Sequence, residues 1–126
     1  MPTTKEKPAL RKDLRADLKA CCEALLDKKA ENLTILYFGE TSPLTDCFVI
    51  ATGTSNPHLR ALRDNLEKTL KERKVELFSK ERFKPSGWLV IDAIDFVIHL
   101  FSREQREHYA LEDLWKDATP IDPESL

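Results

Sequence analysis

The segment Cys47–Ala51 constrains the fold more than any other part of this sequence, because it is apolar at every position. Both of its pleat faces must be buried, so we expect a strand in the middle of a sheet that is covered on both sides. The turn Thr52–Pro57 follows, in which Ser55 or Asn56 can cap a helix. That helix is predicted to run to about Arg73 from its apolar stripe of Leu59, Leu62, Leu66 and Leu70.

The elements on either side of this unit have equally plain patterns. Leucines at spacings of three and four predict a first helix that ends near residues 28–30, and Leu33–Phe38 is a β-branched and aromatic strand stopped by Gly39. Residues 75–78 indicate a shorter third strand with one buried face. Strand 47–51, the helix and strand 75–78 have the lengths of a right-handed β-α-β crossover, which predicts a mixed sheet.

The most apolar part of the chain lies near its end. Trp88–Ile91 and Phe96–Phe101 are separated by Asp92–Asp95 alone, a length that favours an antiparallel hairpin. Ser102 and Gln105 form a Ser-x-x-Gln capping box that opens a last helix, predicted to continue through residue 115.

The predicted order is therefore α-β-β-α-β-β-β-α, and the fold class is α/β: a single domain with a mixed sheet of about five strands flanked by helices. The domain is expected to span residues 1–118, and residues 119–126 are expected to form a frayed C-terminal tail. A length of 126 residues suits one domain, and 41% hydrophobic residues with a net charge of -2 exclude a disordered chain.

Composition also bounds the compartment and the cofactors. No apolar run approaches the ~20 residues that span a bilayer, and no secretory signal opens the sequence, so a cytoplasmic protein with no membrane contact is expected. The three cysteines, Cys21, Cys22 and Cys47, are odd in number and two are adjacent, which does not suit a disulfide framework or a metal site. No cofactor is predicted.

Charge is distributed unevenly along the chain. Residues 58–84 hold nine Lys and Arg against five Asp and Glu, whereas residues 103–126 hold three basic and seven acidic residues. A pI near 5.9 argues against a dedicated nucleic-acid binder, although the basic stretch can still touch a phosphate backbone. The simpler interpretation of that stretch is a solvated helix face.

No constellation of residues predicts catalysis. The turn Gly53–Asn56 precedes a helix N-terminus, where phosphate can bind, but its single glycine matches no phosphate-binding motif. Asp92 and Asp95 are three apart and would face opposite ways on a strand, so they are interpreted as turn residues. Cys47, His99 and Asp46 can be assembled only on paper, and His99 is interpreted first as a core or interface residue.

Aromatic residues are concentrated in the last 39 residues, namely Trp88, Phe96, Phe101, Tyr109 and Trp115. They either fill the core or form an exposed patch on a sheet face that too few helices cover. Such a patch, edged by Arg103, Arg106, Glu107 and Glu112, would be a protein-binding surface.

Four segments, in this order, make the sequence similar to the ribosomal silencing factor (Iojap-like) family over about residues 10–118. They are residues 28–33, 45–56, 88–101 and 109–115, with Trp88-Leu89-Val90-Ile91-Asp92 and Tyr109-Ala110-Leu111-Glu112-Asp113-Leu114-Trp115 among them. Two departures stand out. Asp92-Ala93-Ile94-Asp95 replaces the Asp-Tyr-Gly-Asp that is usual in the family, and Cys47 takes a position that is often Tyr.

The resemblance implies a fold similar to nucleotidyltransferases without the paired catalytic carboxylates, and therefore no enzyme. It implies binding to the large ribosomal subunit through large-subunit protein number fourteen, which blocks joining of the small subunit and represses translation. The residues that match positions around that contact are Trp88, Leu89, Val90, Phe101, Tyr109, Leu111 and Glu112.

Alternatives remain open at this point. Mitochondrial and plastid relatives act in large-subunit assembly, which makes an assembly factor the first alternative. A nucleotide-binding enzyme of nucleotidyltransferase-like fold and a minor contact with ribosomal RNA are the others. The sequence leaves open whether the protein is a monomer or a homodimer.

Overall fold

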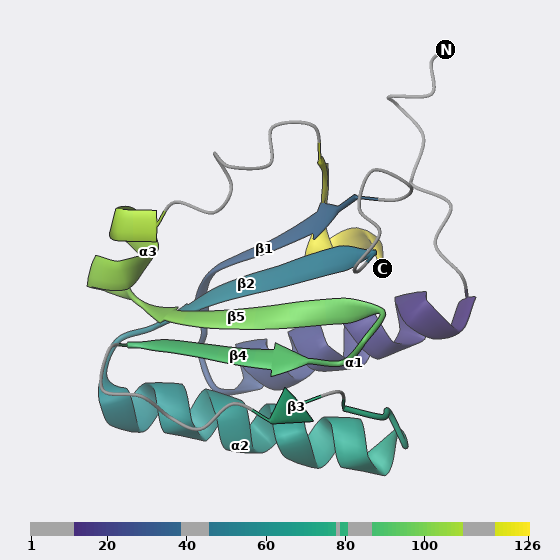
Figure 1. Cartoon of the computed structure of the whole chain (residues 1–126), viewed down its shortest axis with the longest axis horizontal. Helices are drawn as coiled ribbons and strands as arrows, with labels where there is room; N and C mark the ends of the chain where they lie inside the picture. Colours follow the sequence, from purple (N-terminus) through teal and green to yellow (C-terminus); the bar gives the residue numbers. More distant parts are fainter. Residues whose placement is uncertain (1–11, 39–45, 78, 81–86, 110–117) are drawn as a thin grey trace.

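The structure, a computed structural model, describes residues 12–38, 46–77, 79–80, 87–109 and 118–126 (Figure 1). The elements along the chain are α1 (Lys12–Asp27), β1 (Glu31–Tyr37), β2 (Cys47–Gly53), α2 (Asn56–Glu72), β3 (Ser79–Lys80), β4 (Trp88–Asp92), β5 (Phe96–Ser102), α3 (Arg103–Tyr109), β6 (Thr119–Ile121) and a short 3-10 helix at Pro123–Ser125.

The strands form one mixed sheet in the order β3-β4-β5-β2-β1-β6. β2 and β5 run parallel over their whole length, and the other neighbouring pairs in the described part of the chain are antiparallel. The predicted single α/β domain with a mixed sheet is confirmed. β2 lies in the interior between β5 and β1, as its apolar residues on both pleat faces predict.

Helices α1 and α2 lie side by side on one face of this sheet, which we call the helix face (Figure 1). The α2 stripe of Leu59, Leu62, Leu66 and Leu70 is fully buried there, together with Leu14, Leu18, Cys21 and Leu25 of α1. Each buried leucine contributes about 1.5–3 kcal/mol through removal of its side chain from water. This layer therefore supplies most of the core.

The start of α2 is fixed by a cap that also reaches α1. The Ser55 hydroxyl accepts a hydrogen bond from the His58 amide at 3.1 Å, which satisfies one of the unpaired amides of the first turn. His58 Nδ1 accepts from the Thr54 amide at 2.8 Å, so its other ring nitrogen carries the proton and donates to the Lys28 carbonyl at 2.7 Å. One histidine thus ties the start of α2 to the end of α1.

The hairpin of β4 and β5 confirms the sequence prediction, and a glycine opens it. Gly87 has φ +78, and a Cβ at this position would lie 2.8 Å from the Ser102 hydroxyl. Its carbonyl accepts a hydrogen bond from the Ser102 amide at 2.8 Å. Both the backbone conformation and the close approach of the neighbouring strand require glycine here.

The turn of that hairpin is built by an aspartate, as predicted for Asp92. Its side chain accepts a hydrogen bond from the Ile94 amide at 2.8 Å, and the Ala93 amide donates to the Phe96 carbonyl at 2.9 Å. Ile94 has φ +71 and is 45% exposed. A β-branched residue is strained in this conformation, which glycine adopts freely.

The third strand lies later in the chain than predicted, at Ser79–Lys80, and pairs with β4 at the edge of the sheet. Val75 and Leu77 are partly buried against the core without being part of a strand, and Phe78 lies outside the described residues. The predicted β-α-β crossover therefore does not join neighbouring strands of the sheet, because β5 and β4 lie between β2 and β3. A seven-residue apolar strand pairs with β2 over more backbone than a two-residue strand can.

The frayed tail predicted for residues 119–126 is wrong. β6 pairs antiparallel with β1, Ile121 is buried, and Arg15 donates to the Ser125 carbonyl at 3.2 Å. The outer edge of β1 carries backbone groups that need partners, and β6 satisfies them. Pro120 is tolerated because β6 is an edge strand. The sheet consequently has six strands.

The last helix begins as predicted. Ser102 Oγ accepts a hydrogen bond from the Gln105 amide at 3.2 Å and caps α3. The Ser102 amide is bound to Gly87 instead of the Gln105 side chain, so the capping box is one-sided. The predicted continuation of this helix through Trp115 lies outside the described residues.

Candidate functional site

The second face of the sheet carries aromatic side chains on three neighbouring strands, and we call it the aromatic face. Its residues occupy the positions that alternate with those of the helix face: Leu36 on β1 and Phe38 just after it, Phe48 and Ile50 on β2, Val97, His99 and Phe101 on β5, and Trp88 and Val90 on β4. Both long helices lie on the opposite face (Figure 1). Within the described segments, the two long helices therefore leave this face of the hairpin uncovered.

The rings of the aromatic face form a continuous series across the sheet. Phe38 and Phe48 meet edge to face with ring centroids 4.9 Å apart, and Phe48 lies 4.5 Å from the ring of His99. The His99 and Phe101 rings are nearly parallel, with their centroids 6.1 Å apart. Contacts of this kind add about 0.5–1.5 kcal/mol each to the stabilisation that burial of the rings provides.

Trp88 ends this series at its β4 side. Its indole stacks on Phe101 with ring centroids 5.1 Å apart and an interplanar angle of 29°, and its Nε1–H donates to His99 Nδ1 at 3.2 Å. Trp88 is only half-buried, so part of this residue is accessible to solvent. The two contacts hold the indole while the residue stays partly accessible, which is what an interface anchor requires.

The predicted contact residues around Trp88 separate onto two faces. Val90 is half-buried on the aromatic face, two residues along β4 from Trp88. Phe101 is also on this face but is fully buried beneath Trp88. Leu89 is fully buried in the core of the helix face, because successive residues of a strand point to opposite sides. Among the residues whose burial the structure describes, Trp88 and Phe48 are the half-buried aromatic residues of this face.

The other predicted contact residues follow β5. Tyr109 is the last residue of α3, and Leu111 and Glu112 lie outside the described residues. α3 is fastened to the end of the sheet by two arginines. Arg103 forms a two-pronged ion pair with Glu31, at 2.9 and 2.8 Å, and Arg106 donates to the hydroxyls of Thr52 and Thr34, both at 3.0 Å.

His99 is a buried polar residue at the centre of the aromatic face. It is only 7% exposed, and its Nε2 has no hydrogen-bond partner among the residues that the structure describes. Burial lowers the pKa of His99 to about 4, because the charged imidazolium would lose its hydration. The ring is therefore neutral at pH 7.

The catalytic arrangement of Cys47, His99 and Asp46 that the sequence allows does not form. The Cys47 side chain is buried in the core of the helix face, whereas His99 lies on the aromatic face. Burial also raises the pKa of the Cys47 thiol to about 12, so no thiolate is present at neutral pH.

The turn before α2 offers its polar groups to its own chain. The amides of Thr54 and His58 are bound by His58 Nδ1 and Ser55 Oγ. Asp92 is engaged in the hairpin turn. No group of three or more His, Cys, Asp or Glu residues in the described segments is arranged to hold a metal ion.

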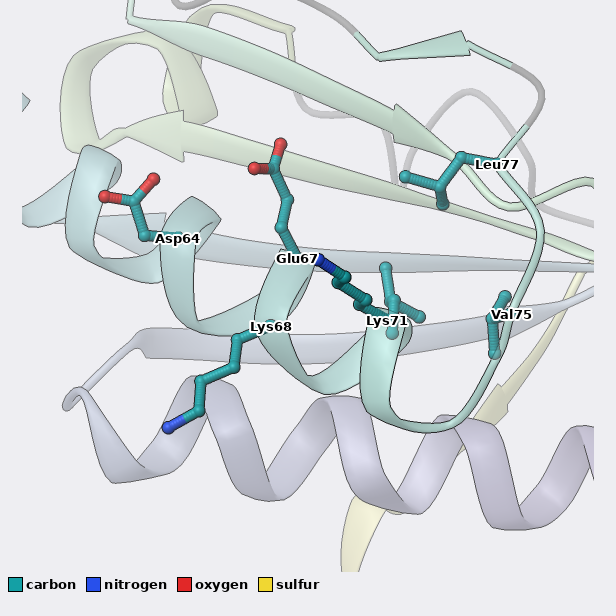
Figure 2. A pocket seen from close by; sticks show the side chains of 7 residues that line it. Asp64, Glu67, Lys68, Lys71, Val75 and Leu77 are labelled. Atoms are coloured by element: carbon teal, nitrogen blue, oxygen red, sulfur yellow. The ribbon is translucent and has the colours of Figure 1, made fainter.

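The basic stretch of the sequence borders a groove of about 610 Å³ beside α2 (Figure 2). Asp64, Glu67, Lys68 and Lys71 line it from the helix, and Val75 and Leu77 line it from the segment that follows. Because two carboxylates and two lysines line it, the groove has little net attraction for a phosphate backbone. This agrees with the interpretation of the stretch as a solvated helix face.

Sequence reasoning placed Trp88 at the site but missed two residues that shape it. Phe48 was assigned only to a buried strand, and His99 was given no defined partner. The alternation along β2 and β5 contains the necessary signal, since Phe48, His99 and Phe101 all share one pleat parity. The missing information was which strands are neighbours.

Comparisons with known proteins bear on this site. The family model described as "Ribosomal silencing factor during starvation" matches residues 11–126. The chain belongs to the ribosomal silencing factor family.

Individual relatives agree with this family. The ribosomal silencing factor of Halalkalibacterium halodurans is 33% identical over 109 residues, which cover 86% of this chain and 93% of the relative. A crystal structure of a Chromobacterium violaceum protein superposes with a TM-score of 0.77 at 30% identity, covering 81% of this chain and 85% of that one.

One relative carries a different name. The mouse protein "Mitochondrial assembly of ribosomal large subunit protein 1" is 33% identical over 105 residues, which cover 79% of this chain and 45% of the relative. Ribosomal silencing factors and this assembly protein are named for their association with ribosomes, not as enzymes. Among the described residues, none of the helices is both long and apolar enough to cross a membrane.

Proposed function

We propose that the protein binds the large ribosomal subunit through large-subunit protein number fourteen and thereby prevents the small subunit from joining. The half-buried Trp88 on the aromatic face is the observation that carries this proposal, together with membership of the family. Trp is among the residues most often found as binding hot spots. We place this action in the cytoplasm.

The contact is assigned to the β4 side of the aromatic face. Trp88 and Val90 would touch the partner, Phe101 would support the indole from below, and Leu89 would hold β4 on the helix layer. Tyr109, Leu111 and Glu112 remain proposed contact residues at and beyond the end of α3.

The mechanism needs no bond-making step. A standard interface covers roughly 800 Å² on each partner, about a tenth of the 7728 Å² accessible surface of this chain. If the protein occupies the surface where the two subunits meet, both cannot be bound at once. Repression is then competition for space, and its strength depends on affinity and concentration alone.

Sedimentation of the purified protein with large subunits, alone and with added small subunits, tests this proposal. We expect co-sedimentation with large subunits and fewer joined ribosomes. Trp88→Ala and Val90→Glu should weaken both effects. Leu26→Ala is the matched control, because Leu26 is a large apolar residue that is 52% exposed on α1, away from the aromatic face.

The name of the mouse relative favours one second candidate, a role in assembly of the large subunit. Binding to large subunits without any loss of joining would support assembly over silencing. No binding to large subunits at low salt would contradict both.

A further inference from the structure

His99 is a buried polar residue that packing alone does not explain. Its ring lies among Phe48, Trp88 and Phe101, with 7% of the residue exposed. A hydrophobic side chain of similar size would fill this space without placing a polar atom in it. The presence of an imidazole therefore needs another reason.

The chemistry of the two rings fixes the position of the imidazole proton. An indole N–H can only donate, so the 3.2 Å contact from Trp88 Nε1 requires an unprotonated Nδ1 on His99. The neutral ring must then carry its proton on Nε2, which has no partner in the described part of the chain. A buried donor that is left unpaired destabilises the folded state, so this arrangement stabilises the fold less than an apolar residue would.

His99 acts on the orientation of the Trp88 side chain. Stacking on Phe101 fixes the plane of the indole but does not distinguish its two edges, since an aromatic stack is compatible with a flipped ring. The hydrogen bond to His99 selects the edge that carries Nε1 and holds it toward the sheet. Together the two contacts leave the side chain a single orientation.

We propose that His99 is a positioning residue for partner binding, which holds the indole of Trp88 in its binding orientation as a neutral Nε2–H tautomer. This inference rests on the proposed function, because it takes Trp88 as the anchor. A preorganised anchor avoids the entropy that a mobile side chain loses on binding. Loss of His99 should therefore weaken binding about threefold to tenfold.

Two variants separate positioning from packing. His99→Leu removes the acceptor and keeps an apolar filling, whereas His99→Asn can place its amide oxygen near the former Nδ1 position. We expect His99→Leu to be folded, with a melting temperature equal to or above that of the parent, and to bind large subunits threefold to tenfold more weakly. His99→Asn should recover most of the affinity. A merely structural role predicts the opposite, with stability lost and affinity per folded molecule unchanged.

A spectroscopic measurement tests the positioning without any ribosome. In the Trp115→Phe background the single indole N–H resonance belongs to Trp88. We expect it to exchange slowly with solvent and to have restricted motion, and His99→Leu to abolish both properties. Nitrogen spectra of the histidine rings should show His99 as the Nε2–H tautomer at pH 7.

The outcomes distinguish the two proposals. An unchanged Trp88 resonance in His99→Leu, or His99 in the Nδ1–H or charged form, would overturn the positioning role whatever the ribosome assay gives. Alternatively, the Trp88 resonance could change in His99→Leu while both His99→Leu and Trp88→Ala bind large subunits normally. His99 would then hold the indole, but the indole would not be part of the contact with the ribosome. That result contradicts the proposed site and with it the functional role of His99.

Discussion

The helix face and the aromatic face use alternate residues of the same strands, yet they are covered differently. On the helix face, side chains from two long helices fully bury most of the strand residues. On the aromatic face, Phe48, Trp88, Val90 and Val97 stay half-buried around a core of Phe101 and Ile50. One sheet therefore separates a fully packed layer from a layer whose described residues are only partly covered.

The comparison teaches where substitutions should act. A side chain buried among aliphatic neighbours contributes to stability through its burial, and its loss leaves a cavity. A half-buried ring held by hydrogen bonds and stacking contributes less to stability and more to binding. The predictions below test this separation, from the largest expected effect to the smallest.

Leu66→Ala on the helix face should have the largest effect. Leu66 is fully buried in the α2 stripe, so truncation removes apolar contacts and leaves a cavity. We expect the free energy of unfolding to fall by about 2–5 kcal/mol, measured by urea denaturation. The folded fraction should still bind large subunits with the parent's affinity. Weakened affinity of the folded fraction would show that the two faces are not independent.

Stability should fall at acidic pH because of His99 on the aromatic face. Its folded pKa of about 4 lies below the ordinary value of 6.5, so the unfolded chain binds more protons between these values. Stability is therefore retained above pH 6.5 and lost as pH falls toward 4, by about 3 kcal/mol. Urea unfolding of the parent and of His99→Leu over pH 7 to 4 should show this loss in the parent alone. Identical pH dependence would contradict it.

Trp88→Ala should separate binding from stability. If the indole is a hot spot, the free energy of binding to large subunits weakens by ~2 kcal/mol or more, which lowers the affinity roughly thirtyfold. Because the side chain is only half-buried, we expect it to destabilise the fold less than Leu66→Ala does. Titration of large subunits with labelled protein, alongside urea denaturation, measures both quantities. A loss of stability as large as that of Leu66→Ala, without loss of affinity, would make the aromatic face an ordinary core.

Ile94→Gly should give the smallest effect, with the opposite sign. Ile94 sits in the turn that joins β4 to β5 with φ +71, a conformation that glycine adopts without strain. We expect stabilisation by about 1 kcal/mol, after the greater freedom of glycine in the unfolded chain is subtracted. Ile94→Ala is the control, since it removes the exposed side chain but retains the strained backbone. Equal stabilisation by both would show that exposure, not strain, is the cause.

Much of the fold was predictable because it depends on local patterns. The two-faced strand at Cys47–Ala51, the α2 stripe and the β4–β5 hairpin follow from periodicity, turn length and capping residues. The misplaced third strand and the supposed frayed tail were errors of a different kind. Both concern short segments whose strand pairing is stabilised only by a distant partner, β4 for Ser79–Lys80 and β1 for Thr119–Ile121.

By itself the sequence determined the α/β class, the interior place of β2 and the hairpin that carries Trp88, because these depend on spacing and residue type. Only the tertiary structure decided that Leu89 lies in the helix-face core and that His99 accepts the indole N–H. The parallel pairing of β2 with β5 and the antiparallel pairing of β4 with β5 bring Phe48, His99 and Trp88 to one face from three strands. Strand neighbours are chosen by long-range burial and backbone hydrogen bonding, and neither leaves a local mark in the sequence.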